Sequence, residues 1–468
     1  MLESRRRVLL IASALLLAAG SVLAQPTPPV VPKTVEVQLP APVELPPPDR
    51  MPEGITTAPI AADEAAAIAL FNQPSVTVAG AGIEAAKGRT AQARAGLKPR
   101  VGVSAALNAS EVSGAPAGSS GGAPSHYQVG AAVEQLIYDY DHTRDLVRQA
   151  LEQEKVATAA LTTVQADLVL GVKQAFYGLL EAQRLVTVAE SNVRNQQQHL
   201  ALAQARLKSG LGLPYDVVRA QTAYSDAVYG LTVSRNRASQ ARVALAELMG
   251  LDPRTPLVPA ESVEPPPATE AVGESVNQAQ QQRPEVLRAD AAIRAAQFAV
   301  SAARTVNSPQ VSGSLGMTRR GDDFFPSTNV TTLGVELQWT PFDAGFTKGR
   351  VQEAEANLVA ARAQLDAVRL QVTGEVSQAY LDLKTAEQRA VTAETQVTNA
   401  HEALRLAEGR YRAGLGVFID VLDAQTALDV ANINQVNAQT AVEQARAALE
   451  HSAGAGLARL RAVMGERK

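Results

Sequence analysis

The chain of 468 residues contains no cysteine, so it can form no disulfide bond, no thiolate catalytic site and no lipidated N-terminal cysteine. Aromatic residues make up only 4%, and the formal net charge is −4. With acids and bases interspersed, the chain has no basic surface for nucleic acid. Few aromatics and abundant alanine favour long helices packed closely through small side chains over a broad globular core.

The sequence also lacks recognisable catalytic and cofactor motifs. It contains no Walker glycine loop, nucleophile elbow or dinucleotide fingerprint. Its five histidines are scattered, and none belongs to an HExxH pattern or another metal-ligand spacing. We therefore expect no catalytic residue, no metal site and no cofactor, and an enzyme is not indicated. The histidines are His126, His142, His199, His401 and His451.

The N-terminus has the features of a secretory signal peptide. Arg5, Arg6 and Arg7 precede an apolar run over 8–17, and a small-residue stretch ends at Ala24. We predict cleavage after Ala24, so that residues 1–24 are the signal peptide. An uncleaved anchor is the alternative, although the run is short of the roughly 20 residues that a spanning helix needs. No later segment is apolar enough to span, so a membrane form would have to be a β-barrel.

Two proline-rich stretches divide the rest of the chain. Residues 25–59 are predicted to be an extended lead-in, and residues 251–274 a linker. The segments 60–250 and 275–450 are copies of each other, and residues 451–468 form a C-terminal tail. Gly210-Leu211-Gly212 recurs 204 residues later as Gly414-Leu415-Gly416, as does Ala220-Gln221-Thr222-Ala223 at 424–427. The chain is therefore an internal tandem repeat.

Each copy predicts a helix, a β-hairpin, a very long helix, a sharp turn and a returning helix. In the second copy apolar residues recur every seven positions from Val351 to Ala407 without proline. Roughly 68 helical residues would span on the order of 100 Å. Their broad apolar faces favour a tube of helices, with a two-stranded rod as the alternative. The expected hairpins are 100–138 and 310–342, the long helices 141–208 and 345–412, and the returning helices 214–249 and 418–450.

The predicted strands have one apolar and one polar face. Residues 311–318, 332–339 and 127–134 alternate clearly, whereas 101–110 alternate poorly. Glu134 and Glu336 fall on the polar face, as a water-filled lumen requires. An ordinary sheet packed on helices is the alternative. Aromatic residues near the strand ends are candidates for the membrane interface, namely Tyr127, Tyr138, Tyr140, Trp339 and Phe342, with Phe324 and Phe325 nearby.

The number of strands indicates an oligomer. Four strands cannot close a barrel around a pore, and eight would leave an interior filled by side chains. A lumen therefore requires at least three chains.

Several motifs follow one another in a fixed order through the two copies, from Ile60 to about Leu449. They are Ala62–Leu70 before Pro74, Gln92–Leu97 before Pro99, Thr340–Gly345, and the Arg-x-x-x-Gly-Leu turns beginning at Arg206 and Arg410. With these motifs the chain resembles the TolC family of outer-membrane factors.

The resemblance implies a mainly α-helical homotrimer in the outer membrane of a Gram-negative bacterium. A twelve-stranded β-barrel, with four strands per chain, would continue into a helical coiled-coil barrel that crosses the periplasm. The implied function is a passive export duct of a tripartite efflux pump or type I secretion system. Its partners would be outer-membrane lipid, a periplasmic adaptor protein and an inner-membrane pump or ABC transporter.

The two glycine turns are expected at the periplasmic tip. Gly210, Gly212, Gly414 and Gly416 would allow tight reversals, and an adaptor could contact Leu211 and Leu415. Asp216 lies just beyond the first turn. A plain glycine-rich loop is the alternative, but it does not explain why both copies repeat the leucine.

The resemblance also implies a channel gate formed by Asp420, Asp423 and Tyr411. The two aspartates are spaced i and i+3 and share one helical face, so that threefold symmetry would stack them as carboxylate rings. Stabilisation of a helix N-terminus is the alternative role of these acids. Gly416 occupies the position of the family's locking arginine, so the sequence leaves open whether the gate is locked.

The main rival is a periplasmic coiled-coil adaptor, also called a membrane fusion protein. It would need neither lipid-facing strands nor a second long helix, and the sequence predicts both. A structural envelope tether is a third possibility and would not conduct ions. The exported substrate is not readable from the sequence.

Overall fold

The computed structural model describes residues 59–109, 125–261, 272–321, 324 and 326–466, with the single positions 39, 41 and 46. The expected signal peptide, most of the proline-rich lead-in and Phe325 lie outside the described residues. The chain divides into two units, which are described separately. The first contains residues 183–238 and 399–433, and the second contains the β-sheet, the shorter helices and the other parts of the four longest helices.

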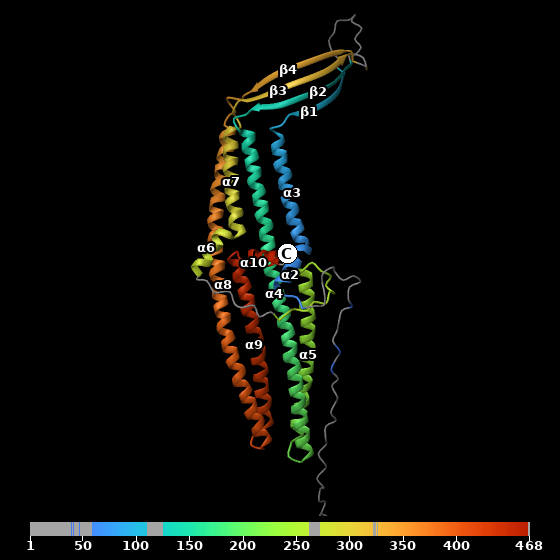
Figure 1. The fold of residues 1–468 in the computed structure, drawn as a ribbon, viewed down its shortest axis with the longest axis vertical. Helices are drawn as coiled ribbons and strands as arrows, with labels where there is room; N and C mark the ends of the chain where they lie inside the picture. Colours follow the sequence, from blue (N-terminus) through green and yellow to red (C-terminus); the bar gives the residue numbers. More distant parts are fainter. Residues whose placement is uncertain are drawn as a thin grey trace, which may run out of the picture. The chain divides into compact units, whose positions relative to one another are not determined.

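The strands form one antiparallel sheet in the order β1-β2-β3-β4 (Figure 1). Their bounds are Arg100–Ala109 for β1, Ser125–Tyr138 for β2, Gln310–Gly321 for β3 and Thr328–Gln338 for β4. Each copy supplies one hairpin, and the pairing of β2 with β3 joins the copies. β1 and β4 each have a single neighbour, so the sheet has two outer edges that no strand of this sheet covers.

The strand register gives the sheet two chemically distinct faces. Val101 lies beside Val133, which lies beside Leu315, which lies beside Leu333. Although the sequence of β1 alternates poorly, this register puts its valines on the same face as the other apolar side chains. We call it the apolar face. Its apolar members are Val101, Val103, Ala105, Leu107, Tyr127, Val129, Ala131, Val133, Val311, Leu315, Met317, Leu333, Val335 and Leu337.

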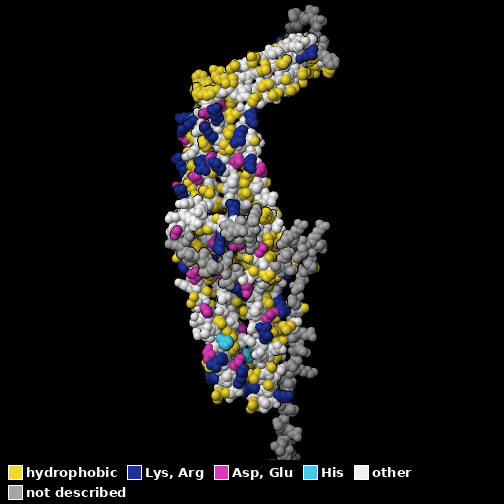
Figure 2. Space-filling view, in the orientation of Figure 1, with side chains coloured by type: hydrophobic (Ala, Val, Ile, Leu, Met, Phe, Trp, Pro, Cys, Tyr) yellow, Lys and Arg dark blue, Asp and Glu magenta, His cyan; other side chains and the backbone are white. Residues whose placement is uncertain are grey.

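The opposite, polar face carries mainly small and polar side chains, including Ser104, Gln128, Ser314 and Thr332. Glu134 and Glu336 also lie on it, as the alternation predicted. Leu333, Val335 and Leu337 are 81%, 72% and 64% exposed in the single chain. Figure 2 shows hydrophobic side chains spread along the visible surface of the sheet.

The helices follow the same order in both copies. The first copy contains α2 (Ala62–Asn72), α3 (Pro74–Ala95), α4 (His142–Lys208) and α5 (Pro214–Leu248), and the second contains α6 (Val272–Gln282), α7 (Pro284–Thr305), α8 (Phe346–Arg412) and α9 (Phe418–Ser452). Pro74 and Pro284 begin α3 and α7, where the missing amide hydrogen costs no helical hydrogen bond. The long helices α4 and α8 contain 67 residues each.

Two segments differ from the sequence expectation. The region expected to be a C-terminal tail from residue 451 contains α10, which spans Gly456–Glu466. Its Leu457 and Leu460 are buried in a core with α2, α4 and α5. The linker expected to continue to residue 274 ends earlier, because α6 begins at Val272.

The sheet is joined to the long helices by the same strained connection in both copies. Tyr140 and Asp141 have φ angles of 55° and 65°, and Ala344 and Gly345, 204 residues later, have φ angles of 51° and 90°. An aspartate then caps each helix. The Asp139 carboxylate accepts the Thr143 amide at 2.8 Å, and the Asp343 carboxylate accepts the Thr347 amide at 2.8 Å. The repeat therefore extends to backbone conformation.

α4 is the exception to the expectation that no segment after residue 24 is apolar enough to span a membrane. By length and composition alone, α4 passes such a test, as does the bent pair α2 and α3 taken together. However, Val172 and Phe176 of α4 are buried in the core with α2, α5 and α10. These contacts cover only part of the helix, because 17% of its most apolar 18 residues are buried in the single chain.

A buried lysine connects four helices around this core. The Lys173 amine contacts the Asp63 and Glu450 carboxylates at 2.8 and 3.2 Å, and Arg459 contacts Glu450 at 2.6 Å. Burial by itself would lower the pKa of Lys173, but the charges of Glu450 and Asp63 raise it above its ordinary value. The ion pairs therefore hold α2, α4, α9 and α10 together.

Candidate functional site

The turns that follow α4 and α8 have the same helix-ending geometry. Gly210 and Gly414 adopt φ angles of 75° and 76°, which L side chains rarely occupy. The Leu211 amide donates to the Arg206 carbonyl at 2.9 Å, and the Leu415 amide donates to the Arg410 carbonyl at 2.9 Å. Each glycine amide also donates, at 3.0 Å, to the carbonyl three residues before it. Together these bonds form the Schellman motif, which satisfies the last helical carbonyls.

In this motif the residue after the glycine usually packs on an apolar side chain in the last turn of its own helix. Here the corresponding helix positions are Arg206 and Arg410. Leu211 and Leu415 are accordingly 73% and 75% exposed. The backbone fixes both leucines tightly while their side chains are left facing outward.

The second glycine of each turn is placed differently from the first. A Cβ atom on Gly212 would lie 2.8 Å from the Leu207 nitrogen, so the chain reverses too closely for any side chain. A Cβ on Gly416 would meet the Arg410 Cβ at 3.2 Å and nothing closer. Gly416 is thus tightly packed but less constrained than its counterpart.

Tyr411 connects the two helix pairs of the first unit. Arg206 donates to the Tyr411 carbonyl at 2.6 Å and to the Arg412 carbonyl at 3.3 Å, and its guanidinium lies 4.6 Å from the Tyr411 ring centre. The Tyr411 hydroxyl donates to the Asp216 carboxylate at 3.5 Å, and its ring packs on Phe418 at 5.3 Å. Burial and the Asp216 charge raise the pKa of Tyr411.

The expected gate residues therefore occupy two environments. Tyr411 is only 3% exposed and lies with Asp216, which the sequence had placed at the tip. Asp420 and Asp423 are exposed in the first two turns of α9. Sequence reasoning missed the role of Arg206, although it lies in the turn motif, because its partner is 205 residues away.

A polar layer lies farther along the same unit. The His199 ring nitrogen Nε2 lies 3.3 Å from the Gln425 carbonyl oxygen, and the Gln425 amide donates to the Asp429 carboxylate at 2.8 Å. His199 and Gln425 are 4% and 0% exposed. Burial raises the pKa of Asp429 to about 6. This layer makes the contact between α4 and α9 specific, because its buried polar groups must stay paired.

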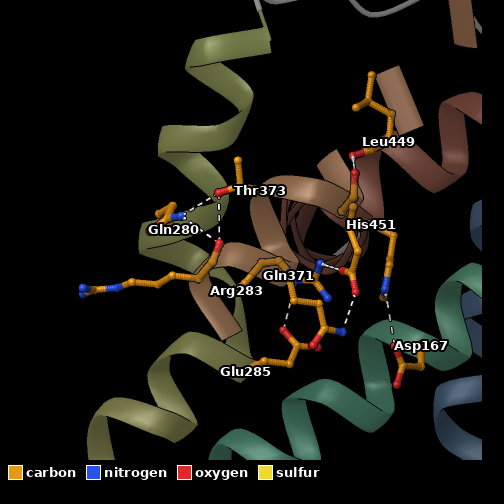
Figure 3. A network of polar contacts seen from close by, with 11 residues as sticks. Asp167, Gln280, Arg283, Glu285, Gln371, Thr373, Leu449 and His451 are labelled. Atoms are coloured by element: carbon orange, nitrogen blue, oxygen red, sulfur yellow. Dashed lines mark hydrogen bonds and ion pairs between the residues drawn. The ribbon is translucent and has the colours of Figure 1, made fainter. Parts of the chain in front are cut away.

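A second polar cluster lies in the other unit, near the end of α9 (Figure 3). Arg283 pairs with Glu285 at 3.0 Å and also with Glu375. His451 lies 3.4 Å from Asp167, and burial together with Arg283 lowers its pKa. Arg283 thus joins the start of α7 to α8, and the pair of His451 with Asp167 joins α9 to α4. In the described part of the chain, no three His, Asp or Glu side chains form a metal-binding group.

The predicted interface aromatics fall at both ends of the strands. Tyr138 and Tyr140 have ring centres 4.8 Å apart, and Trp339 and Phe342 nearby are 56% and 83% exposed. Tyr127, at the opposite end of β2, packs against Phe324 at 5.6 Å.

Comparison with known proteins identifies the family. The family described as "Outer membrane efflux protein" matches residues 66–251 and 275–455. The protein CyaE of Bordetella pertussis is 27% identical over 387 residues, which cover 81% of this chain and 80% of CyaE. The outer membrane protein TolC of Vibrio cholerae is 25% identical over 377 residues, covering 79% and 84%.

Among solved structures, the outer membrane protein VceC from Vibrio cholerae superimposes with a TM-score of 0.73 at 22% identity, covering 84% of this chain and 96% of that one. The same fold and the two matched repeats confirm the family expected from the sequence motifs. The chain belongs to the outer membrane efflux protein family, and it is an outer-membrane export channel that extends into the periplasm, not a periplasmic adaptor.

Proposed function

We propose that three copies of this chain form one passive export duct, closed by a twelve-stranded β-barrel and continued by the helices. The observation that carries the proposal is the sheet, which has one apolar face, one polar face and two outer edges without a partner strand in the sheet. Unpaired edges are costly in a membrane, where no water can satisfy the backbone. Pairing β4 of one chain with β1 of the next removes all of them.

The same chemistry supports the orientation of the sheet. The apolar face would contact lipid, and the polar face with Glu134 and Glu336 would line a water-filled lumen. Interface aromatics at the helix-proximal end, such as Trp339 and Phe342, would lie at the periplasmic boundary of the membrane.

Engineered disulfides test the closure directly, because the chain has no cysteine of its own. We expect Ser104→Cys on β1, combined in turn with Thr328→Cys, Thr332→Cys or Glu336→Cys on β4, to give covalent trimers in at least one combination. Residues opposite each other on paired strands approach within disulfide range. The measurement is the size of the oxidised product on denaturing gels.

The matched control pairs Ser104→Cys with Gln128→Cys on the interior strand β2. We expect it to give no covalent trimer, because β2 is already paired on both sides. Monomers in every combination, together with no conductance in planar bilayers, would contradict the trimeric duct.

We further propose that Asp420 and Asp423 form stacked acidic rings at the periplasmic end of the duct. Their exposure and their spacing on one face of α9 support this arrangement. Across about 6 Å, two like charges cost only about 0.7 kcal/mol in water. The rings would therefore bias the passage of ions without preventing assembly.

Replacing both Asp420 and Asp423 with alanine is expected to reduce the cation preference of single channels, because the lumen loses its fixed negative charge at the narrowest point. Reversal potentials in a salt gradient measure the preference. Asp226→Ala, at an exposed aspartate on α5, is the control and should change little. Equal selectivity in all three proteins would count against the acidic rings.

At the tip, we propose that Leu211 and Leu415 contact a periplasmic adaptor, which connects the duct to an inner-membrane pump or ABC transporter. The two Schellman turns support this role, because they hold an exposed leucine in the same position on each helix pair. Exposed apolar side chains on a rigid backbone are suited to docking.

A further inference from the structure

Arg319 interrupts the apolar face of the sheet. The register places it between Val129 on β2 and Asn329 on β4, in line with Ala105 on β1. It is the one charged side chain on this face among the described strand residues, and it is exposed. A charge on a lipid-facing surface requires a specific location, because arginine costs about 2–4 kcal/mol at the bilayer midplane and close to nothing at its edge.

The distance along the strand supplies that location. Asn329, beside Arg319, is ten residues from Trp339, which follows β4 at the helix-proximal end. Ten residues at about 3.4 Å each, in a strand tilted by about 40°, rise about 26 Å, close to the apolar height of about 25 Å in membrane barrels. If the aromatics at 339 and 342 mark one boundary of the membrane, Arg319 lies at the other.

That other boundary is the extracellular one. The long helices α4 and α8 follow β2 and β4 at the end of the sheet near Trp339, and in the proposed duct they lead into the periplasm, so the opposite ends of the strands would face outward. The outer leaflet of a Gram-negative outer membrane is built from phosphorylated glycolipid. The neighbouring row of the sheet holds Tyr127, which packs on Phe324, an arrangement suited to the level of lipid headgroups.

We propose that Arg319 anchors a phosphate of an outer-leaflet glycolipid headgroup, with Tyr127 beside it. The planar guanidinium can donate two parallel hydrogen bonds to a phosphate, and this charge-assisted geometry is among the strongest available to a side chain. The inference rests on the proposed function, because it requires the apolar face to contact lipid.

Arg320 provides a matched control within the same strand. It follows Arg319 directly but lies on the polar face, beside Gln128 and Thr328. The variants Arg319→Gln and Arg320→Gln therefore remove the same charge from opposite faces of one strand. Arg319→Lys keeps the charge but loses the two-pronged geometry.

The experiment measures lipid bound to purified protein in phosphate-free detergent by native mass spectrometry, with bisphosphorylated lipid A as the probe. We expect Arg319→Gln to need about tenfold more lipid A than the wild type, because glutamine can still donate one hydrogen bond but lacks the charge and the second parallel bond. Arg320→Gln should match the wild type, and Arg319→Lys should lie between. Inorganic phosphate, the second probe, should not compete at millimolar concentration.

Two results would overturn the site: equal lipid retention in both glutamine variants, or effective competition by free phosphate. Unchanged lipid retention with lower thermal stability in detergent is the first of these results, and it would assign Arg319 a role confined to pairing with Asp322 and Asp323, which follow in the sequence. Normal trimers and conductance with unchanged retention reject the site alone. Absence of trimers and conductance in the wild type rejects the proposed function and the site together.

Discussion

Replacing Leu211 and Leu415 together with aspartate is expected to abolish export while leaving trimers intact. Both side chains are about three-quarters exposed, at 73% and 75%, and neither fills a core of the single chain. The substitutions therefore lower the stability of the folded protein only slightly. If the adaptor buries both leucines, the aspartate variant would lose about 1.5–3 kcal/mol of binding free energy for each leucine. Binding would also have to bury a charge at each position. Even the lower figure, summed over two leucines, corresponds to about a hundredfold weaker binding per chain.

The measurement is complementation of the export defect in a deletion strain, with heat-resistant trimers on gels as the assembly control. Leu211→Met and Leu415→Met are the matched variants, because they keep an apolar side chain of similar volume at each turn. They should export normally. Normal export by the aspartate variant would show that these leucines do not contact the adaptor, and loss of trimers would assign them a structural role instead.

The two glycine turns show which parts of the candidate site were predictable from the sequence. The repeat itself revealed both turns, because Gly210 and Gly414 are required for a positive φ angle and recur with the same spacing. Local features of this kind can be predicted from short sequence motifs. By contrast, the contact between Arg206 and Tyr411 joins residues 205 positions apart, and no periodicity indicates which arginine will reach which carbonyl.

The sheet illustrates the same limit. β1 alternates too poorly for its faces to be assigned alone, and its apolar face becomes evident only when β2 fixes the register at Val101 and Val133. Arg319 could be seen in the sequence, but its significance depends on the neighbours that pairing gives it. Likewise, α10 is a short helix whose Leu457 and Leu460 are held by a core formed by distant segments.

Replacing Arg206 with alanine is expected to loosen the end of the duct, so that channels open more often. The guanidinium bonds two carbonyls at the end of α8 and stacks on the Tyr411 ring, so that α4 and α8 end together. The part-buried hydrogen bond to the Tyr411 carbonyl and the cation–π contact together make the loss about 2–4 kcal/mol, and the longer, exposed bond to Arg412 adds little. Gly416 cannot supply a replacement side chain.

Arg410 provides the control, because it occupies the same position in the second copy but is exposed. We expect Arg410→Ala to leave gating nearly unchanged, although both variants remove one positive charge from an Arg-x-x-x-Gly-Leu turn. Single-channel open probability in planar bilayers measures the effect, and entry of vancomycin into cells reports the same opening in the membrane. If the two variants have the same open probability, charge rather than the Arg206–Tyr411 contact controls the opening of the channel. If only Arg206→Ala opens the duct, the contact within one chain takes over the restraint that an arginine at position 416 would otherwise provide.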